Sequence, residues 1–230
     1  MFWDSDSGHS RERAVVRSER RKDKIVSQQN IKAIIFDFGG VLVDWSPHNL
    51  YRHYFDQPHE IDCFLKEINF AEWNAQQDKG RPFAQAVAEH STKFPQYAQL
   101  IHAYHERWED SIVGPIEGTT RILKKLKQKG YPLYGLSNWS AETFPLIRNK
   151  YKFFDLFDYI LISGEVKMIK PEPGIFDLLL NRINLEARAC LFIDDSEANI
   201  KVAARLGFDT IRFQSPTQLG LELMQRNILD

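Results

Sequence analysis

Short apolar segments alternate with helical patterns from residue 31 to the end of the chain. Residues 34–36 form an apolar run that ends at Asp37 and a Gly39-Gly40 turn, which is the pattern of a buried strand. Similar runs follow at residues 133–136, 160–162, 191–193 and, more weakly, 210–213. Between them, apolar residues recur at helical spacing in residues 116–126, 175–183 and 200–206, and Ser215-Pro216-Thr217-Gln218 begins a last helix as a capping box. This alternation predicts an α/β fold, a parallel sheet with helices on both faces.

One connection is too long for simple alternation. About 70 residues separate the first predicted strand from the helix that begins near Glu117, and a connection of that length should contain its own structure. Its apolar residues recur at helical spacing, so we predict a helical cap over residues 44–112, inserted between core segments 31–43 and 113–230. The cap would follow the carboxyl end of the first strand, and ligands bind at this edge of open parallel sheets. The cap residues we expect to line the pocket are Trp45, Arg52, His53, Trp73, Asn74, Arg81 and Trp108.

Composition narrows the possible partners. Hydrophobic residues make up 43% of the chain, charged residues 27%, and the net charge is -1, so no global field attracts nucleic acid or an anionic membrane. No apolar stretch approaches the roughly 18 residues that a membrane span needs. Residues 1–30 are polar, rich in arginine and lysine and without apolar periodicity, which predicts a disordered or weakly ordered tail. We expect a cytoplasmic protein, either a monomer or a homodimer.

Polar residues collect where the predicted strands end. Asp37 follows the first strand, Ser137-Asn138 the second and Asp194-Asp195 the fourth, and the Lys170-Pro171 step comes shortly after the third. All of them should project onto one edge of the sheet, under the cap. Three carboxylates facing one lysine repel one another and lose hydration. A cation with oxygen ligands balances this charge best, and Mg²⁺ suits a site of a few carboxylates and a phosphate.

These residue types predict phosphoryl transfer. The Asp37 carboxylate can attack phosphorus when a metal ion neutralises both it and the phosphate. Ser137 can donate to a phosphoryl oxygen, Lys170 can offset charge on another, and we expect Asn138, beside Ser137, to bind the phosphate as well. The backbone at Gly39-Gly40 can approach closely and cradle the phosphate. Water would then hydrolyse the aspartyl-phosphate.

The four motifs resemble those of the haloacid dehalogenase superfamily: Asp37-Phe38-Gly39-Gly40-Val41, Ser137-Asn138, Lys170-Pro171 and Asp194-Asp195. The resemblance covers residue 31 to the end, and it implies a Rossmann-like core, a cap of the family's first type, Mg²⁺ and Asp37 as nucleophile. It also implies that Asp37, the carbonyl of Gly39 and Asp195 hold the metal. Asp194 would be a further carboxylate that supports Lys170 or a metal-bound water. The first motif looks most like that of small sugar- and polyol-phosphate phosphatases.

The sequence departs from this family at Gly39. The usual phosphatase has an aspartate two positions after the nucleophile, which serves as general acid and base. General acid catalysis matters most for a strongly basic leaving group, so its loss favours a substrate such as a sugar 1-phosphate. Asp44 and His48 are candidates to replace the missing acid.

Two alternatives remain open. A 2-haloacid dehalogenase also uses an aspartate nucleophile without a second aspartate at the Gly39 position, but it needs no metal, and Asp194-Asp195 would then be unbalanced charge. A module that binds Mg²⁺ and a phosphorylated ligand without turnover is the second alternative. Retention of Asp37 argues against the second.

Overall fold

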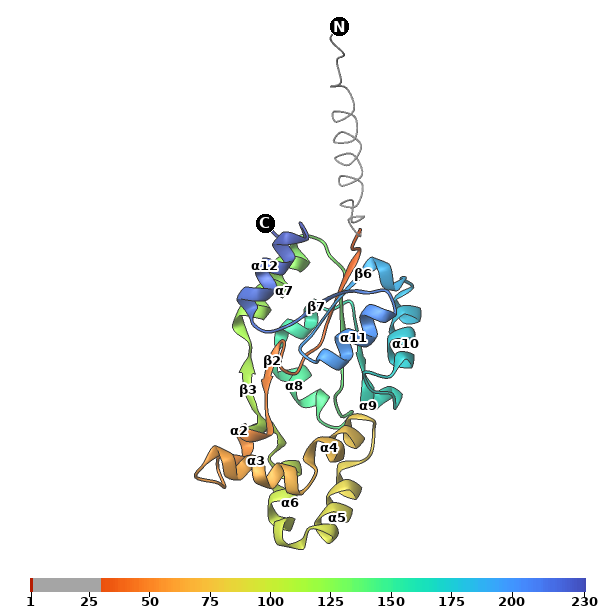
Figure 1. Ribbon diagram of the computed structural model, residues 1–230. Coiled ribbons are helices and arrows are strands. Elements are labelled where there is room, and N and C mark those ends of the chain that lie inside the picture. The colour runs from red at the N-terminus through yellow and green to blue at the C-terminus, as the bar shows by residue number, and fades with distance from the viewer. Residues whose placement is uncertain (2–29) are drawn as a thin grey trace. The chain divides into compact units, whose positions relative to one another are not determined.

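A parallel sheet of five strands runs through the part of the chain that the computed structural model describes, residue 1 and residues 30–230 (Figure 1). The strand order is β5-β4-β1-β6-β7. The strands are β1 (Ala33–Phe36), β4 (Leu133–Ser137), β5 (Tyr159–Ile162), β6 (Cys190–Asp194) and β7 (Asp209–Arg212). All four residues of β1 are apolar and buried, because its two faces pack into separate hydrophobic clusters. The predicted strands and their parallel pairing are confirmed.

Helices cover both faces of this sheet, as the sequence predicted. One face packs against α7 (Glu117–Gln128), α8 (Phe144–Lys150) and α12 (Pro216–Gln225), and the other against α10 (Pro173–Ile183) and α11 (Glu197–Arg205). The short helix α9 (Ser163–Val166) follows β5, and single 3-10 turns lie at η3 (Lys152–Leu156) and η4 (Ala187–Ala189). The Ser215 side chain caps α12 by accepting from the Gln218 amide, whereas the Gln218 side chain accepts from the Gln214 amide, so the predicted capping box is only half formed.

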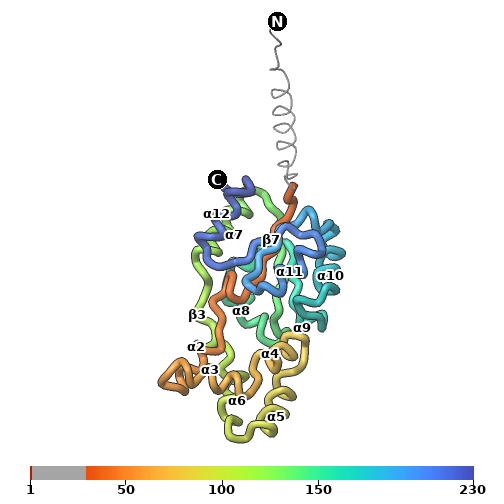
Figure 2. The backbone as a smooth tube through the Cα atoms, in the orientation of Figure 1, coloured from red at the N-terminus to blue at the C-terminus, as the bar shows by residue number. Residues whose placement is uncertain are grey.

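The long connection after β1 begins and ends in an antiparallel ribbon that the sequence did not reveal. β2 (Val43–Trp45) pairs with β3 (Ile112–Pro115), and both strands are too short to show a period-2 pattern. Between them lie α2 (Pro47–Tyr51), α3 (Pro58–Glu67), α4 (Phe70–Asp78), α5 (Phe83–Lys93) and α6 (Ala98–Glu106), here called the cap helices, with 3-10 turns η1 (Pro95–Tyr97) and η2 (Trp108–Ser111). Figure 2 shows these segments gathered on one side of the core. The predicted cap boundaries at residues 44 and 112 fall in this ribbon. Residues Ile31–Asp230 form one compact unit, so the separation of a cap domain from the core domain stays a prediction.

The cap helices bury an aromatic interior of their own. Tyr104 lies at its centre, with Phe70 at 4.9 Å and Trp73 at 5.6 Å between ring centroids. Trp73 also stacks on His90 and, unlike Phe70 and Tyr104, does not line the cavity described below. Aromatic pairs at these separations contribute stability beyond their buried area.

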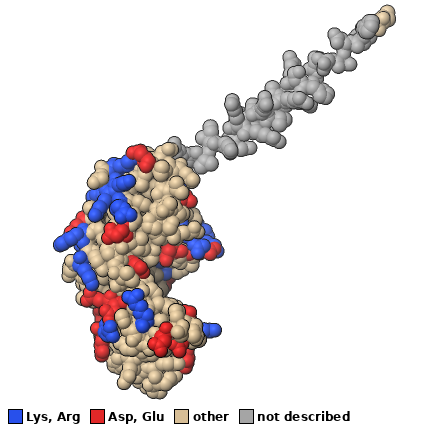
Figure 3. All heavy atoms as spheres, turned by 90° about the vertical axis from the view of Figure 1, so that its left-hand side faces the viewer, with Lys and Arg blue, Asp and Glu red and all other residues tan. Residues whose placement is uncertain are grey.

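Charges of both signs are interspersed on the face shown in Figure 3, in keeping with the net charge of -1. The cap helices likewise carry acidic and basic side chains side by side, as in the ion pair between Arg81 and Glu89. Among the helices described here, none is long and apolar enough to span a membrane. The prediction for residues 1–30 lies outside the described residues, apart from the two ends of that segment.

Phe38, the residue after Asp37, is held in place by packing within the core. The ring of Phe38 packs 5.0 Å from Phe154 and 5.4 Å from Phe157, and it also lies over Gly135 of β4. A Cβ at Gly135 would lie only 2.3 Å from the Phe38 ring. Glycine in this strand therefore makes room for the side chain that anchors the loop carrying Asp37.

We expect Gly135→Ala to destabilise the protein by about 1–3 kcal/mol, because the buried Phe38 ring cannot retreat from the added methyl group. Urea unfolding measures this change. The matched control is Gly220→Ala in α12, where the nearest atom lies 4.0 Å from the new Cβ, and this change should stabilise the helix by about 0.5–1 kcal/mol. Equal effects of the two substitutions would contradict the packing argument.

Candidate active site

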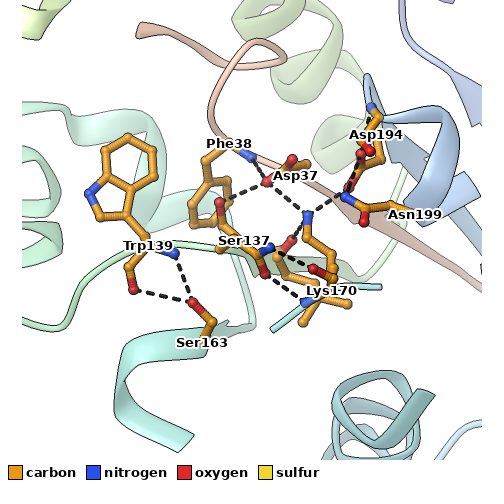
Figure 4. Close-up of polar contacts among 11 residues, drawn as sticks. Asp37, Phe38, Ser137, Trp139, Ser163, Lys170, Asp194 and Asn199 are labelled. Atoms are coloured by element: carbon orange, nitrogen blue, oxygen red, sulfur yellow. Dashed lines mark hydrogen bonds and ion pairs between the residues drawn. The ribbon is translucent and has the colours of Figure 1, made fainter. Parts of the chain in front are cut away.

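The end of β1 presents Asp37 at the edge of the sheet with one carboxylate oxygen fully used. Oδ1 accepts from the Phe38 amide and the Ser137 hydroxyl, each at 2.7 Å, and lies 3.0 Å from the Lys170 ammonium (Figure 4). Among the described residues, no donor bonds to Oδ2. The three donors hold the carboxylate in place, and the second oxygen remains available to a ligand or a reacting atom.

Lys170 is buried between two of the carboxylates. Its ammonium donates to Asp194 Oδ2 at 2.6 Å and to the Leu136 carbonyl at 2.8 Å, in addition to the contact with Asp37. These partners account for its three protons. Lysine in such a position both neutralises the carboxylates and fixes their separation.

Asn138 holds the backbone of Lys170 through its side-chain amide. Its amide nitrogen donates to the Lys170 carbonyl at 2.9 Å, and its amide oxygen accepts from the Lys170 backbone amide at 2.8 Å. Both polar atoms of the side chain thus have a partner. One proton of the amide nitrogen remains for a ligand, and Asn138 lines the cavity described below, so its phosphate-binding role stays a prediction.

The two consecutive aspartates have different surroundings. Asp194 is buried and accepts from the Ser196 amide at 2.8 Å and from Asn199, whose Nδ2 lies 3.0 Å from both carboxylate oxygens. Asp195 is exposed and lies against Gly40, where an added Cβ would come within 2.5 Å of its Oδ2. Gly40 has a φ of +73°, so glycine is required there for both reasons. Asn199 is a site residue that the sequence reasoning missed.

The carboxylates outnumber the cations at this edge. Oxygens of Asp37, Asp194 and Asp195 lie within 4.8 Å of one another. The pKa of Asp37 is raised to about 7, mainly by burial and also by the charges of Asp194 and Asp195, against the opposing effect of Lys170. Burial and Asp194 also raise the pKa of Asp195. Burial alone would lower the pKa of Lys170, but Asp194 and Asp37 outweigh it and raise the pKa.

These shifts have two causes, which are burial of the charged groups and negative charge that Lys170 balances only in part. A divalent cation among the three carboxylates would remove the imbalance, and an all-oxygen donor set suits Mg²⁺. The described residues therefore fit the predicted metal. Asp194 already has protein partners for both oxygens, which favours its predicted support of Lys170 over direct ligation.

A cavity of about 670 Å³ lies between this edge and the cap helices. Its core wall includes Asp37, Gly39, Gly40, Ser137, Asn138, Trp139, Lys170 and Asp195. Its cap wall is mostly aromatic and includes Trp45, Phe70, Asn74, Asp78, Phe83, Tyr104 and Trp108. A ligand here would meet the carboxylates on one side and aromatic rings on the other.

Only some of the predicted cap residues reach this cavity. Trp45, Asn74 and Trp108 line it, whereas Arg52 and His53 are exposed elsewhere and Arg81 pairs with Glu89. The lining residues Phe70, Phe83, Tyr104 and Asp78 were not foreseen, because helical periodicity does not tell a cap core from a pocket wall.

The two candidates for a replacement acid lie outside the cavity wall. Asp44 is exposed on β2. His48 is hydrogen-bonded through Nε2 to Asp62 at 2.8 Å. Neither residue lines the cavity, so the proposal that one of them replaces the acid missing at Gly39 finds no support in the geometry.

Comparison with known proteins gives the family. The family model of haloacid dehalogenase-like hydrolases matches residues 31–207. Sesquiterpene phosphatase AstK of Aspergillus oryzae is 27% identical over 200 residues, which are 84% of this chain and 95% of that protein. D-ribitol-5-phosphate phosphatase of Bacteroides thetaiotaomicron is 26% identical over 214 residues, 84% of this chain and 97% of that protein. Mouse acyl-CoA dehydrogenase family member 10 is 27% identical, but the match spans only 19% of its length.

Solved structures agree with this result. A HAD family enzyme of Bacteroides thetaiotaomicron in complex with magnesium and inorganic phosphate superposes with a TM-score of 0.60 and 28% identity. The match covers 80% of this chain and 95% of that one. The Rossmann-like fold class predicted from the sequence is therefore confirmed.

We expect Asn199→Ala to lower stability by roughly 1–3 kcal/mol, because buried Asp194 then loses a donor that contacts both of its oxygens. Chemical denaturation measures the change. Asn149→Ala, at an exposed position of α8, is the matched control and should be close to neutral. A neutral Asn199→Ala variant would mean that Lys170 and Ser196 alone hold Asp194.

Proposed function

Since the chain belongs to the haloacid dehalogenase-like hydrolase family, we propose that it is an Mg²⁺-dependent phosphatase of a small phosphorylated metabolite. The observation that carries this proposal is the cluster of Asp37, Asp194 and Asp195 around a single lysine at the mouth of a ligand-sized cavity. Relatives named as phosphatases and a structural neighbour bound to magnesium and phosphate support it.

In the proposed reaction the Asp37 carboxylate attacks phosphorus, and the bond from phosphorus to the ester oxygen breaks with its electron pair leaving on that oxygen. The Ser137 hydroxyl, which lies 2.7 Å from Asp37, and the Lys170 ammonium would each bind a phosphoryl oxygen in exchange for their present contact with Asp37 Oδ1. Backbone at Gly39 and Gly40 can approach the phosphate closely. Mg²⁺ held by Asp37, the Gly39 carbonyl and Asp195, with Asp194 close by, would neutralise the phosphate and lower the repulsion between two anions. Water then hydrolyses the aspartyl-phosphate.

The first candidate substrate class is a sugar or polyol phosphate, in particular a sugar 1-phosphate. Its support is the absence of a carboxylate at Gly39, which favours an easily displaced leaving group, and the relationship to a ribitol-phosphate phosphatase.

The aromatic cap wall favours a second candidate, an ester with an apolar organic group. Trp45, Phe70 and Phe83 offer apolar area to a ligand, and burial of such area contributes about 25 cal/mol per Å². A sugar, by contrast, carries several hydroxyl groups that need polar partners. Asn74, Asp78 and Tyr104 are the polar side chains that the cap wall described above offers to such hydroxyl groups. One relative is named as a sesquiterpene phosphatase.

We expect purified protein to release inorganic phosphate only when Mg²⁺ is present, and EDTA to abolish the release. Asp37→Asn should lower kcat by roughly 10³-fold or more, because the nucleophile is lost. Asp177→Asn, which changes an exposed carboxylate on α10, is the matched control and should retain activity. Chloride release from chloroacetate that EDTA leaves unchanged would instead establish the dehalogenase alternative. Stabilisation by phosphorylated ligands without any turnover would support the non-catalytic alternative.

A substrate panel separates the two classes. We expect a higher kcat/KM for glucose 1-phosphate than for glucose 6-phosphate, and a lower KM for a prenyl phosphate than for either sugar phosphate, because the aromatic wall binds apolar groups. Malachite green detection of phosphate measures all three. A preference for the 6-phosphate would contradict the leaving-group argument, and a KM lowest for a sugar phosphate would contradict the second candidate.

A further inference from the structure

Asp78 brings a carboxylate to the cavity from the cap side. It is the last residue of α4, and among the described residues it is the one acidic side chain on the cavity wall that does not belong to the proposed metal cluster. At position 39, two residues after the nucleophile, the chain has glycine instead of an acid. The proposed phosphatase still needs a proton for the departing ester oxygen and a base for the attacking water.

A hydrogen-bonded chain within the cap orients the Asp78 carboxyl group. The Tyr104 hydroxyl donates to Asn74 Oδ1 at 2.8 Å, which directs the Asn74 amide nitrogen toward Asp78. That nitrogen donates to Asp78 Oδ2 at 3.0 Å. Tyr104 and Asn74 are both buried, so the chain is shielded from competing water.

The backbone of Asp78 is docked on the core at Ser163. Its carbonyl accepts from the Ser163 hydroxyl at 2.5 Å, and the same hydroxyl oxygen accepts from the Trp139 amide at 2.9 Å, a contact drawn in Figure 4. Two residues later, Gly80 has a φ of +94°, and a Cβ there would lie 2.7 Å from the Gly164 carbonyl. Only glycine allows the turn after α4 to approach α9 so closely.

An ion pair strengthens this docking. The Lys79 ammonium lies 2.6 Å from Glu172 of the core. Residues 78–80 are therefore tied to the core by the Asp78 carbonyl, the Lys79 side chain and the backbone at Gly80. This arrangement keeps Asp78 on the wall of the cavity that Asp37 also lines.

The surroundings of Asp78 favour its protonated form. The pKa of Asp78 is raised to about 7, mainly by burial and also by the charge of Asp37, while the Ser140 amide opposes the shift. The carboxyl group also lies at the C-terminus of α4, where the helix dipole disfavours a negative charge. An acid that keeps its proton near neutral pH can donate it and later take one up.

We propose that Asp78 is the general acid and base of this enzyme, supplied by the cap in place of the carboxylate absent at Gly39; the inference rests on the proposed phosphatase function. In the first step Asp37 bonds to phosphorus, the ester P–O bond breaks, and the Asp78 proton passes to the leaving oxygen, which departs as an alcohol. In the second step the Asp78 carboxylate takes a proton from water as its oxygen bonds to phosphorus. The bond from phosphorus to Asp37 then breaks, phosphate leaves, and Asp78 is again protonated.

With Asp78 as the acid, the substrate is no longer restricted to easily displaced leaving groups, so the preference for glucose 1-phosphate over glucose 6-phosphate is expected only if Asp78 does not act as the acid. An alkoxide leaves poorly without a proton, whereas an alcohol protonated by Asp78 does not require an electron-withdrawing substituent. Both candidate substrate classes are then compatible with the chemistry. The cap would supply the proton from α4 and, with its aromatic wall, the contacts that select the substrate.

The test compares leaving groups. For Asp78→Asn we expect kcat/KM to fall by roughly 10²–10⁴-fold with an alkyl phosphate but by much less with p-nitrophenyl phosphate, whose leaving group needs no proton. Rapid mixing of this variant with p-nitrophenyl phosphate should show a burst of nitrophenolate, because hydrolysis of the aspartyl-phosphate has lost its base. Asp78→Glu should recover part of the alkyl phosphatase activity. Asp56→Asn, an exposed carboxylate of the cap, is the matched control.

A second variant distinguishes loss of the acid from misfolding of the Asp78→Asn protein. Adding Gly39→Asp to Asp78→Asn restores an acid two residues after the nucleophile, where an added Cβ meets Trp139 at 3.8 Å without a clash, and should rescue alkyl phosphate hydrolysis. An equal loss for all leaving groups without rescue, or a leaving-group effect in Asp44→Asn instead, would overturn the proposal. If wild-type protein released no phosphate at all, the proposed function would fail; if Asp37→Asn were inactive and Asp78→Asn fully active, only the role of Asp78 would fail.

Discussion

The balance of charge between one ammonium group and three carboxylates is the constraint on which the site depends. Lys170 is buried and contacts Asp37 and Asp194 directly, while Asp195 lies beyond its reach in the described contacts. Removing charged groups from water is unfavourable unless each finds partners. The fold provides these partners from several strands at once, so the sheet, and not any single loop, stabilises the arrangement.

Each contributor to this balance is fixed by a neighbour with no chemical role of its own. Asn138 uses both polar atoms of its side chain on the Lys170 backbone, and Asn199 holds Asp194. Phe38 keeps the loop after β1 in place because Gly135 leaves space for its ring. The geometry of the site therefore depends on packing in the core, because a shift of the Phe38 ring would move the nucleophile.

The sequence predicted the core well because buried strands and amphipathic helices leave strong periodic signals. All five sheet strands were predicted, as was the meeting of Asp37, Lys170 and Asp194 at one edge, since parallel strands end on the same side. The ribbon of β2 and β3 was missed because its strands are too short for a pattern. The pocket wall of the cap was predicted only in part, because Trp73 and Trp108 look alike in sequence and differ only in the direction they face after folding.

The β2–β3 ribbon also bears on how such a molecule can change. Because the chain leaves the core along β2 and returns along β3, its exit and re-entry points lie side by side. Lengthening or exchanging everything between them leaves the spacing of the core strands untouched, and loop-closure entropy grows only slowly with length. The segment between β2 and β3 can therefore change, and with it the ligand preference, while the proposed phosphoryl-transfer centre stays unaltered.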